Sequence, residues 1–161
     1  MTARFPDGPR VALFAGSFDP FTVGHASIVE RAMPLFDRII VAIGVNAAKP
    51  CHQTVADRLE AIRRLYPAEK VEVVAYENEL TVDLAKRLGA GWLLRGVRSV
   101  KDFEYERDMA DVNRRLSGIE TVLLYSLPEL SAVSSSIVRE LQSYGRDVDE
   151  FLPRTHRENQ E

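Results

Sequence analysis

Five short apolar segments recur along the sequence, and each is followed by a stretch whose apolar residues have helical spacing. The segments are Val11–Ala15, Arg38–Val45, Val71–Tyr76, Trp92–Arg95 and Thr121–Tyr125. Their apolar residues are continuous rather than alternating, which is typical of strands covered on both faces in a parallel sheet. Alternation of strand and helix over the whole length therefore predicts an α/β fold, with a five-stranded parallel sheet and helices on both faces.

The helical stretches contain start and stop signals. Thr54 is placed to cap the helix that follows it, and Thr81 to cap Val82–Leu88, which Gly89 then ends. The first helix contains Pro34, so we expect it to kink or to end early there.

Two more helices are expected before Gly118 and Gly145. The first of them is marked by the apolar residues Phe103, Met109, Val112 and Leu116. We expect Phe103 to lie in the core rather than to stack on a base. A doubly wound, Rossmann-like sheet of this kind binds ligands at the carboxyl ends of its strands, where the strand order reverses.

Composition excludes several functional classes. The 161 residues predict a single domain over 1–161, and 45% hydrophobic with 28% charged residues is average for a globular protein. The net charge of −3 offers no positive field for a nucleic-acid backbone. The longest apolar run, Ile39–Val45, is far shorter than the ~20 residues that span a bilayer. The sequence has one cysteine, Cys51, and residues 1–10 contain no apolar signal region. We therefore predict a cytoplasmic protein without membrane or nucleic-acid partners.

The segment after the first expected strand, AGSFDPFTVGH (15–25), has the features of an anion site. Gly16 allows a ligand to approach the backbone, and Ser17 offers a hydroxyl and an amide. Gly24 removes a side chain where the next helix begins. His25 falls in the first turn of that helix, beside free N–H groups and the positive end of the helix dipole.

Two better-known phosphate motifs do not match this segment. No Gly-Lys-Ser/Thr follows it, and Gly-x-Gly-x-x-Gly is missing. The GAG at 89–91 precedes an expected strand, which is the wrong context for a dinucleotide fingerprint. Taken alone, His25 could equally be a capping or surface histidine, but the surrounding Gly16, Ser17 and Gly24 favour a ligand site.

The segment at 16–25 resembles the Thr/His-x-Gly-His signature of the nucleotidyltransferase superfamily, and more closely the phosphopantetheine adenylyltransferase family. Further matching segments are RGVR (95–98), DFEYE (102–106), NR (113–114), VSSS (133–136), VRE (138–140) and FLP (151–153). Thr22 stands where relatives with nicotinamide mononucleotide or a cytidylyl donor usually carry histidine. The resemblance covers residues 10–153 and implies one nucleotidyltransferase domain.

This resemblance implies transfer of AMP from ATP to 4′-phosphopantetheine, giving dephospho-coenzyme A and pyrophosphate. The acceptor phosphate is already an anionic nucleophile, so the reaction needs no general base. The sequence agrees, because it offers no carboxylate pair and no nucleophile triad. The resemblance also implies Mg²⁺ arriving with ATP, a homohexamer, and coenzyme A as a feedback inhibitor.

The resemblance further implies the site residues. The catalytic residues are His25, Ser17, Lys49 and Arg98. The ATP-binding residues are Gly16, Ser17, His25, Gly96, Val97, Arg98, Glu106, Leu130, Ser131, Ala132, Val133, Ser134, Ser135 and Ser136. The residues that bind the acceptor are Ser17, Lys49, Thr81 and Arg95, and no protein ligand to a metal is implied. His25 would stabilise the α-phosphoryl group, Arg98 would hold the β- and γ-phosphates, and Lys49 and Arg95 would bind the acceptor phosphate.

Several of these residues also have a purely structural interpretation. A serine run that opens a helix is often a cap, and a loop lysine such as Lys49 is often solvated. Arg95 ends an apolar strand, where a charge is costly unless it meets a partner or an anion. The acidic run at 102–106 is typical of a solvated helix face, so we assign only Glu106 a contact, with the adenosine part. Asp19 could turn the loop rather than touch a ligand.

Three alternative functions remain. The same chemistry could act on nicotinamide mononucleotide or glycerol 3-phosphate, although Thr22 and the segments 95–98 and 103–106 favour phosphopantetheine. A nucleotide-binding regulatory module without catalysis would not need the full set of polar residues. A nucleic-acid-binding protein is the least favoured, because the sequence has no basic stripe.

Overall fold

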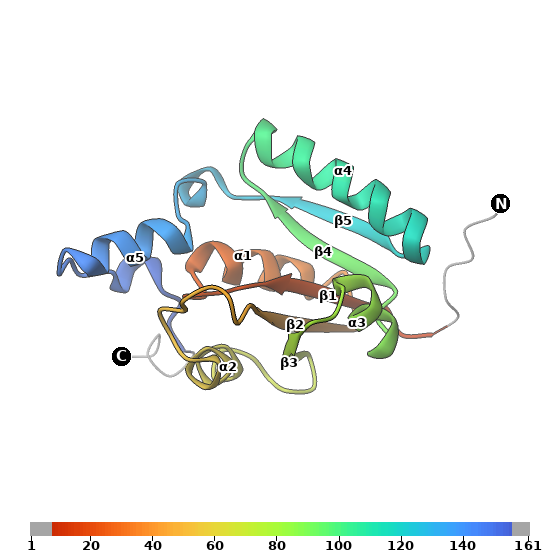
Figure 1. The fold of residues 1–161 in the computed structure, drawn as a ribbon, viewed down its shortest axis with the longest axis horizontal. Coiled ribbons are helices and arrows are strands. Elements are labelled where there is room, and N and C mark those ends of the chain that lie inside the picture. Colours follow the sequence, from red (N-terminus) through yellow and green to blue (C-terminus); the bar gives the residue numbers. More distant parts are fainter. Residues whose placement is uncertain (1–7, 156–161) are drawn as a thin grey trace.

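The computed structural model describes residues 8–155. Five strands form one parallel sheet in the order β3-β2-β1-β4-β5 (Figure 1). They are β1 Val11–Gly16, β2 Arg38–Val45, β3 Val71–Glu77, β4 Trp92–Val97 and β5 Glu120–Tyr125. The five predicted strands are confirmed, with limits that differ by at most two residues. Residues 1–7, part of the segment in which we predicted no signal region, lie outside the described residues.

Helices cover both faces of the sheet, as predicted. They are α1 Val23–Ala32, α2 Val55–Arg63, α3 Thr81–Arg87, α4 Val100–Ser117 and α5 Ser135–Ser143, with short 3-10 turns at Pro128–Leu130 and Asp149–Phe151. Ile28 of α1 and Ile62 of α2 join Phe14 in one core cluster, and Leu84 of α3 joins Leu13 in the other. Successive strand residues point to opposite faces, so β1 contributes to both cores. Within residues 8–155, no helix is both long and apolar enough to cross a membrane.

Most predicted helix ends are confirmed. The Thr54 hydroxyl accepts the amide of Asp57 at 3.1 Å, and α1 ends at Ala32, before Pro34. Gly118 has a φ of +75°, the left-handed conformation that ends a helix. The Thr81 prediction is wrong: Thr81 is already inside α3, and its hydroxyl lies 3.0 Å from the hydroxyl of Tyr76 in a hydrogen bond.

Helix α4 turns a polar face toward the rest of the chain and exposes apolar side chains, the reverse of an ordinary amphipathic helix. Glu106 is its fully buried residue, and the half-buried residues on the same face are Asp102, Ala110, Asn113 and Ser117. The apolar side chains predicted to mark the helix are exposed instead: Phe103 37%, Met109 38%, Val112 48% and Leu116 61%. The expectation that Phe103 lies in the core is therefore wrong. We call Met109, Val112 and Leu116, which share one face of the helix, the apolar stripe of α4.

Candidate active site

A cavity of about 400 Å³ lies where the carboxyl ends of β1 and β4 meet. These neighbours are the strands between which the order of connection reverses, the position expected for a ligand in an open α/β sheet. Its walls are the loop after β1, the loop after β4, and the first turns of α1, α4 and α5. Because each helix start carries free N–H groups and a positive partial charge, three of them around one cavity favour an anion.

The loop that joins β1 to α1 is held tightly by its own side chains. A Cβ atom on Gly16 would lie 2.9 Å from the ring of Phe18, so only glycine fits there. The carboxylate of Asp19 accepts the amides of His52 and Gln53 at 2.7 and 2.8 Å. Asp19 thus anchors the loop to the segment before α2, in agreement with its interpretation as a loop residue.

His25 is locked in one tautomer. The amide of Thr22 donates to Nδ1 of His25 at 3.0 Å, and the amide of His25 donates to the Thr22 hydroxyl at 3.5 Å, forming a capping box. Since Nδ1 accepts this hydrogen bond, the ring proton of the neutral imidazole resides on Nε2. Burial, and then the positive charges of Arg98 and Arg95, lower the pKa of His25 to about 4. At neutral pH, His25 is therefore an uncharged hydrogen-bond donor.

Three phenylalanine rings surround this imidazole. The ring centroids of Phe14, Phe18 and Phe21 lie 6.4, 5.0 and 5.4 Å from that of His25. They remove water from the ring and restrict its rotation. A donor in such a dry, fixed position interacts more strongly with a developing charge than the same donor in water.

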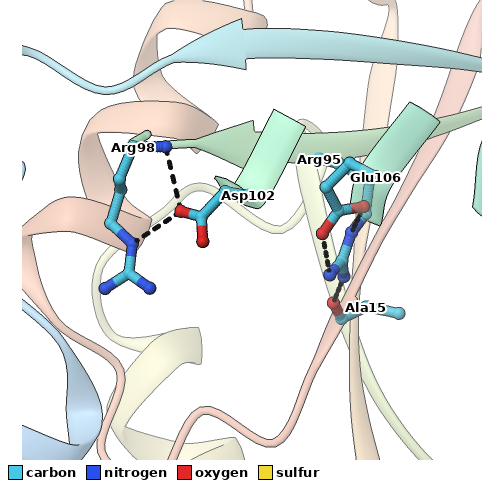
Figure 2. A network of polar contacts seen from close by, with 5 residues as sticks. All are labelled: Ala15, Arg95, Arg98, Asp102 and Glu106. Atoms are coloured by element: carbon cyan, nitrogen blue, oxygen red, sulfur yellow. Dashed lines mark hydrogen bonds and ion pairs between the residues drawn. The ribbon is translucent and has the colours of Figure 1, made fainter. Parts of the chain in front are cut away.

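Arg95 forms a bidentate pair with Glu106 (Figure 2). Its Nε donates to Oε2 at 2.9 Å and its Nη2 to Oε1 at 2.7 Å, while Nη1 donates to the carbonyl of Ala15 at 2.7 Å. Burial tends to lower the pKa of Arg95, but the hydrogen bonds and charge of Glu106 outweigh it and raise the pKa above its ordinary value. Arg95 is thus a permanent cation, joined to both β1 and α4.

Arg98 and Asp102 form a looser pair at the mouth of the same cavity (Figure 2). The amide and Nε of Arg98 both lie 3.2 Å from Oδ2 of Asp102, and both side chains are about one-third to two-fifths exposed, at 42% and 32%. Asp102 is held in the first turn of α4 by the Ser99 cap, whose hydroxyl accepts the Asp102 amide. The sequence analysis treated Asp102 as part of a solvated face, although its i, i+4 spacing from Arg98 indicates this pair.

Two of the serines that open α5 make different contacts within the protein. Ser134 caps the helix by accepting the amide of Ile137, while the hydroxyl of Ser135 donates to the carbonyl of Pro20 at 2.8 Å. Both serines line the cavity with Ser136. Both contacts are structural, so the cap is confirmed for Ser134 and the ligand-binding role of the run stays a prediction.

A second, largely apolar groove of about 320 Å³ adjoins the cavity. It runs between α3 and α4, with Leu80, Thr81 and Met109 among its walls. Arg95 and Glu106 line both spaces, so their ion pair lies at the boundary between them. A ligand with a charged end at Arg95 and a long arm would fit the two together.

The predicted site residues are only partly brought together. Those that line the cavity are Gly16, Ser17, His25, Arg95, Gly96, Arg98, Glu106, Leu130, Val133, Ser134, Ser135 and Ser136. Ser131 and Ala132 lie in the turn before α5, outside the lining, and the side chain of Val97 is buried in β4. Lys49 lies in the exposed loop after β2 and lines neither space, so its role stays a prediction.

Ser126 lines the cavity and was missed by the sequence analysis. It directly follows β5, and the carboxyl end of a parallel strand is the signal that could have found it. Within residues 8–155, no group of three or more His, Cys, Asp or Glu side chains is arranged to hold a metal ion. Both carboxylate oxygens of Glu106 are already bonded to Arg95.

Solved structures with the same fold are nucleotide-transferring or related biosynthetic proteins. A putative nicotinate-nucleotide adenylyltransferase from Vibrio parahaemolyticus aligns over 91% of this chain and 88% of its own, with a TM-score of 0.65 and 15% identity. A lipopolysaccharide core biosynthesis protein from Thermoplasma volcanium aligns over 74% of this chain and 98% of its own, with a TM-score of 0.57 and 16% identity. At such low identity these likenesses establish the fold alone.

Sequence comparison is more specific. The sequence model of the cytidylyltransferase-like family matches residues 13–141. The phosphopantetheine adenylyltransferase of Porphyromonas gingivalis is 54% identical over 144 residues, 89% of this chain and 94% of the relative. That of Bacteroides thetaiotaomicron is 50% identical over 145 residues, 89% of this chain and 95% of the relative. The chain therefore belongs to the cytidylyltransferase-like family and, within it, to the phosphopantetheine adenylyltransferases.

Proposed function

We propose that the cavity around His25 transfers AMP from ATP to 4′-phosphopantetheine, the reaction for which the relatives are named, by direct in-line displacement. An oxygen of the acceptor phosphate forms a bond to the α-phosphorus of ATP while the bond from that phosphorus to the bridging oxygen breaks. Pyrophosphate leaves and dephospho-coenzyme A remains, with no covalent intermediate on the protein. The acceptor is already an anion, so no residue has to remove a proton.

The observation that carries this proposal is the fixed, neutral state of His25. Its Nδ1 is occupied by the Thr22 amide, which leaves the Nε2 proton to donate to the α-phosphoryl group. A neutral donor does not bind the substrate polyphosphate as a cation would, so its hydrogen bond can strengthen as charge shifts in the transition state. Positioning of the two substrates supplies the other large part of catalysis, about 7–11 kcal/mol.

ATP binding falls to the groups at the mouth of the cavity. Arg98 would hold the β- and γ-phosphates, exchanging its contact with Asp102 for phosphate oxygens. The starts of α1 and α5 would add backbone amides, that of Ser135 among them, and the hydroxyls of Ser134 and Ser136. Glu106 keeps acceptor capacity on each oxygen beside its bonds to Arg95, which supports a contact with the adenosine part.

The acceptor would bind across Arg95 into the apolar groove. Three of the five N–H groups of Arg95 are used by Glu106 and Ala15, so two remain for a phosphate. Thr81 lines the groove, which would hold the pantetheine arm. Nicotinamide mononucleotide and glycerol 3-phosphate have no long arm to fill it, which favours phosphopantetheine. Ser17 and Lys49 complete the proposed acceptor set.

Magnesium fits this site as an ion carried by ATP. Asp102 and Glu106 are the carboxylates among the described residues that line the cavity, and Glu106 is committed to Arg95. The Oδ2 atom of Asp102 is bonded to Arg98, while Oδ1 accepts none of the hydrogen bonds found within residues 8–155 and would face a cation. When bound, the metal neutralises phosphate charge and orients the leaving group.

Assembly into a homohexamer is supported by the apolar stripe of α4. Three apolar side chains along one helix face are exposed in the single chain, and an exposed patch of this kind is typical of a protein interface. A second copy of the chain would cover it. Feedback inhibition by coenzyme A is supported by the adjoining cavity and groove, which a molecule with both a nucleotide and a pantetheine arm would fill. The cytoplasmic location stays a prediction.

The test is pyrophosphate release with ATP and Mg²⁺, using 4′-phosphopantetheine or nicotinamide mononucleotide as acceptor. We expect release with phosphopantetheine, and its loss in His25→Ala. Release only with nicotinamide mononucleotide would keep the mechanism and overturn the acceptor. ATP binding without release from either acceptor would favour the regulatory module instead.

A further inference from the structure

Arg58 is a buried cation directly behind the cavity, and the reaction proposed above gives it no role. It lies on α2 and is 4% exposed. Its Nη1 donates to the carbonyl of Ser17 at 2.7 Å, across 41 residues of sequence, and its Nε lies 3.4 Å from the carbonyl of Thr54. The guanidinium therefore joins the start of α2 to the loop that lines the cavity.

None of the ion pairs found among residues 8–155 includes Arg58. Burying a guanidinium without a directly bonded carboxylate is unfavourable, and hydrogen bonds to neutral carbonyls offset that cost only in part. The buried carboxylate of Asp19, which accepts the amides of His52 and Gln53, belongs to the same loop, and the cavity that Ser17 lines is a second place for negative charge. An anion bound in the cavity would stabilise the charge of Arg58 further.

The hydrogen bond to Ser17 also orients a peptide group. In a trans peptide the C=O and the following N–H point in opposite directions, so a Ser17 carbonyl turned toward Arg58 turns the Phe18 amide away from α2. None of the hydrogen bonds found within the described residues uses that amide. Phe18 has a φ of +47°, a left-handed conformation that is strained for a bulky residue and has to be held by its surroundings.

The rest of the loop repeats this pattern. Arg139 of α5 donates to the carbonyl of Asp19 at 2.6 Å, and Ser135 donates to the carbonyl of Pro20. Carbonyls at three of the four positions from 17 to 20 are thus bonded to side chains of α2 and α5. Because Pro20 has no N–H, the outward Asp19 carbonyl frees no amide, whereas the outward carbonyls of Ser17 and Pro20 leave the amides of Phe18 and Phe21 available to an anion.

We propose that Arg58 is a positioning residue for adenylyl transfer. It holds the Ser17–Phe18 peptide so that its N–H serves the nucleotide phosphates, and its charge adds to the positive field of the cavity. This inference rests on the proposed function for its phosphate ligand. It assigns to Arg58 an effect on kcat and on ATP binding that a residue serving stability alone would not have.

The experiment compares Arg58→Met, Arg58→Lys and a control, Arg63→Met. Arg63 lies on the same helix and also donates to a backbone carbonyl, that of Val73 in β3 at 3.0 Å, away from the cavity. For each protein we would measure kcat, both KM values, the melting temperature, and the rise in melting temperature produced by ATP with Mg²⁺. The thermal shift needs no catalysis and reports nucleotide binding by itself.

We expect Arg58→Met to lower kcat about 10²-fold, as misplacement of a binding group can, and to reduce the ATP-induced shift. Arg58→Lys should fall between it and the wild type, because an ammonium keeps the charge but cannot reach both carbonyls. Arg63→Met should keep the wild-type kcat and shift.

A lower melting temperature in Arg58→Met with wild-type kcat and wild-type shift would overturn the proposal, leaving Arg58 a stability residue. If Arg58→Met does not fold, Arg58→Lys tests the proposal in its place. A wild-type kcat together with a wild-type ATP-induced shift in Arg58→Lys would then overturn the proposal. A wild-type protein that binds ATP but forms no dephospho-coenzyme A would overturn the proposed function alone. In that case, a shift that depends on Arg58 would still support the inference.

Discussion

The two walls of the cavity differ in charge, because one presents a neutral side chain and the other presents charged ones. On the α1 side, His25 is neutral, surrounded by three aromatic rings, and bonded through Nδ1 to the backbone of its own helix cap. On the β4–α4 side, Arg95 and Arg98 are charged and paired with acidic residues of α4. The first wall holds the Nε2 proton of His25 ready to donate, whereas the second contains contacts that a phosphate can replace. The comparison assigns transition-state stabilisation to the neutral wall and substrate binding to the charged one.

The two ion pairs of the charged wall differ in burial and in hydrogen-bond length. The pair of Arg95 with Glu106 is bidentate and Glu106 is 8% exposed, while the pair of Arg98 with Asp102 is longer and more exposed. A buried pair is costly to separate, and an exposed one contributes little. Two arginines that stand three positions apart in the sequence are therefore expected to differ in function: Arg95 keeps its pair with Glu106 and offers its remaining N–H groups to the acceptor, whereas Arg98 exchanges partners.

The largest expected effect tests the neutral wall. Removing the Nε2 donor with His25→Ala should lower kcat by about 10²–10³, because its bond is strongest in the transition state. The KM for ATP should change little. Steady-state kinetics measure both, and His52→Ala, which alters an exposed histidine, is the control. A raised KM with an unchanged kcat would reverse the roles assigned to the two walls.

The second prediction concerns pH. The folded protein lowers the pKa of His25 from 6.5 to about 4, so between these values the unfolded chain binds a proton that the folded chain does not. The stabilisation is complete above pH 6.5 and is lost as pH falls toward 4, by about 3 kcal/mol in total. Urea unfolding of the wild type and of His25→Gln across this range isolates the effect. Parallel pH profiles for the two proteins would contradict it.

The third prediction separates the two ion pairs. Glu106→Gln leaves Arg95, whose side chain is 35% exposed, without its counter-charge, and we expect the free energy of unfolding to fall by about 1–3 kcal/mol. Asp102→Asn is the matched control at the exposed pair and should cost less than about 1 kcal/mol. Denaturant titration of both variants gives the comparison, and equal losses would show that burial does not distinguish the pairs.

The smallest effect has the opposite sign. Asp102→Asn removes the competitor of phosphate at Arg98, so ATP should bind more tightly, by less than about 1 kcal/mol or fivefold in Kd. Isothermal titration calorimetry with the two proteins would measure it. Weaker binding in the variant would instead indicate that Asp102 contributes to ATP binding, for example through a metal carried by the nucleotide.

Much of the architecture follows from local sequence. The five apolar segments predicted every strand, and the caps at Thr54 and Gly118 were read from residue type and position. The α4 helix was predicted too, but one of its apolar marker residues, Phe103, was assigned to the core. In the single chain, Phe103 and the apolar stripe are exposed because a polar face, with Glu106 at its centre, turns inward to meet Arg95. Periodicity identifies an amphipathic helix, but it does not say which face packs on the same chain.

The sequence by itself determined the succession of strands and helices along the chain. It also determined the loop between β1 and α1 and the position of His25 in the first turn of a helix. All of these depend on neighbours within a few residues. Only the tertiary structure decided which partner each polar side chain takes. Arg95 meets the Ala15 carbonyl 80 residues away, and Arg58 meets that of Ser17 across 41. Such pairings follow from how the sheet brings distant segments together, because hydrogen bonds form by distance in space and carry no local sequence period.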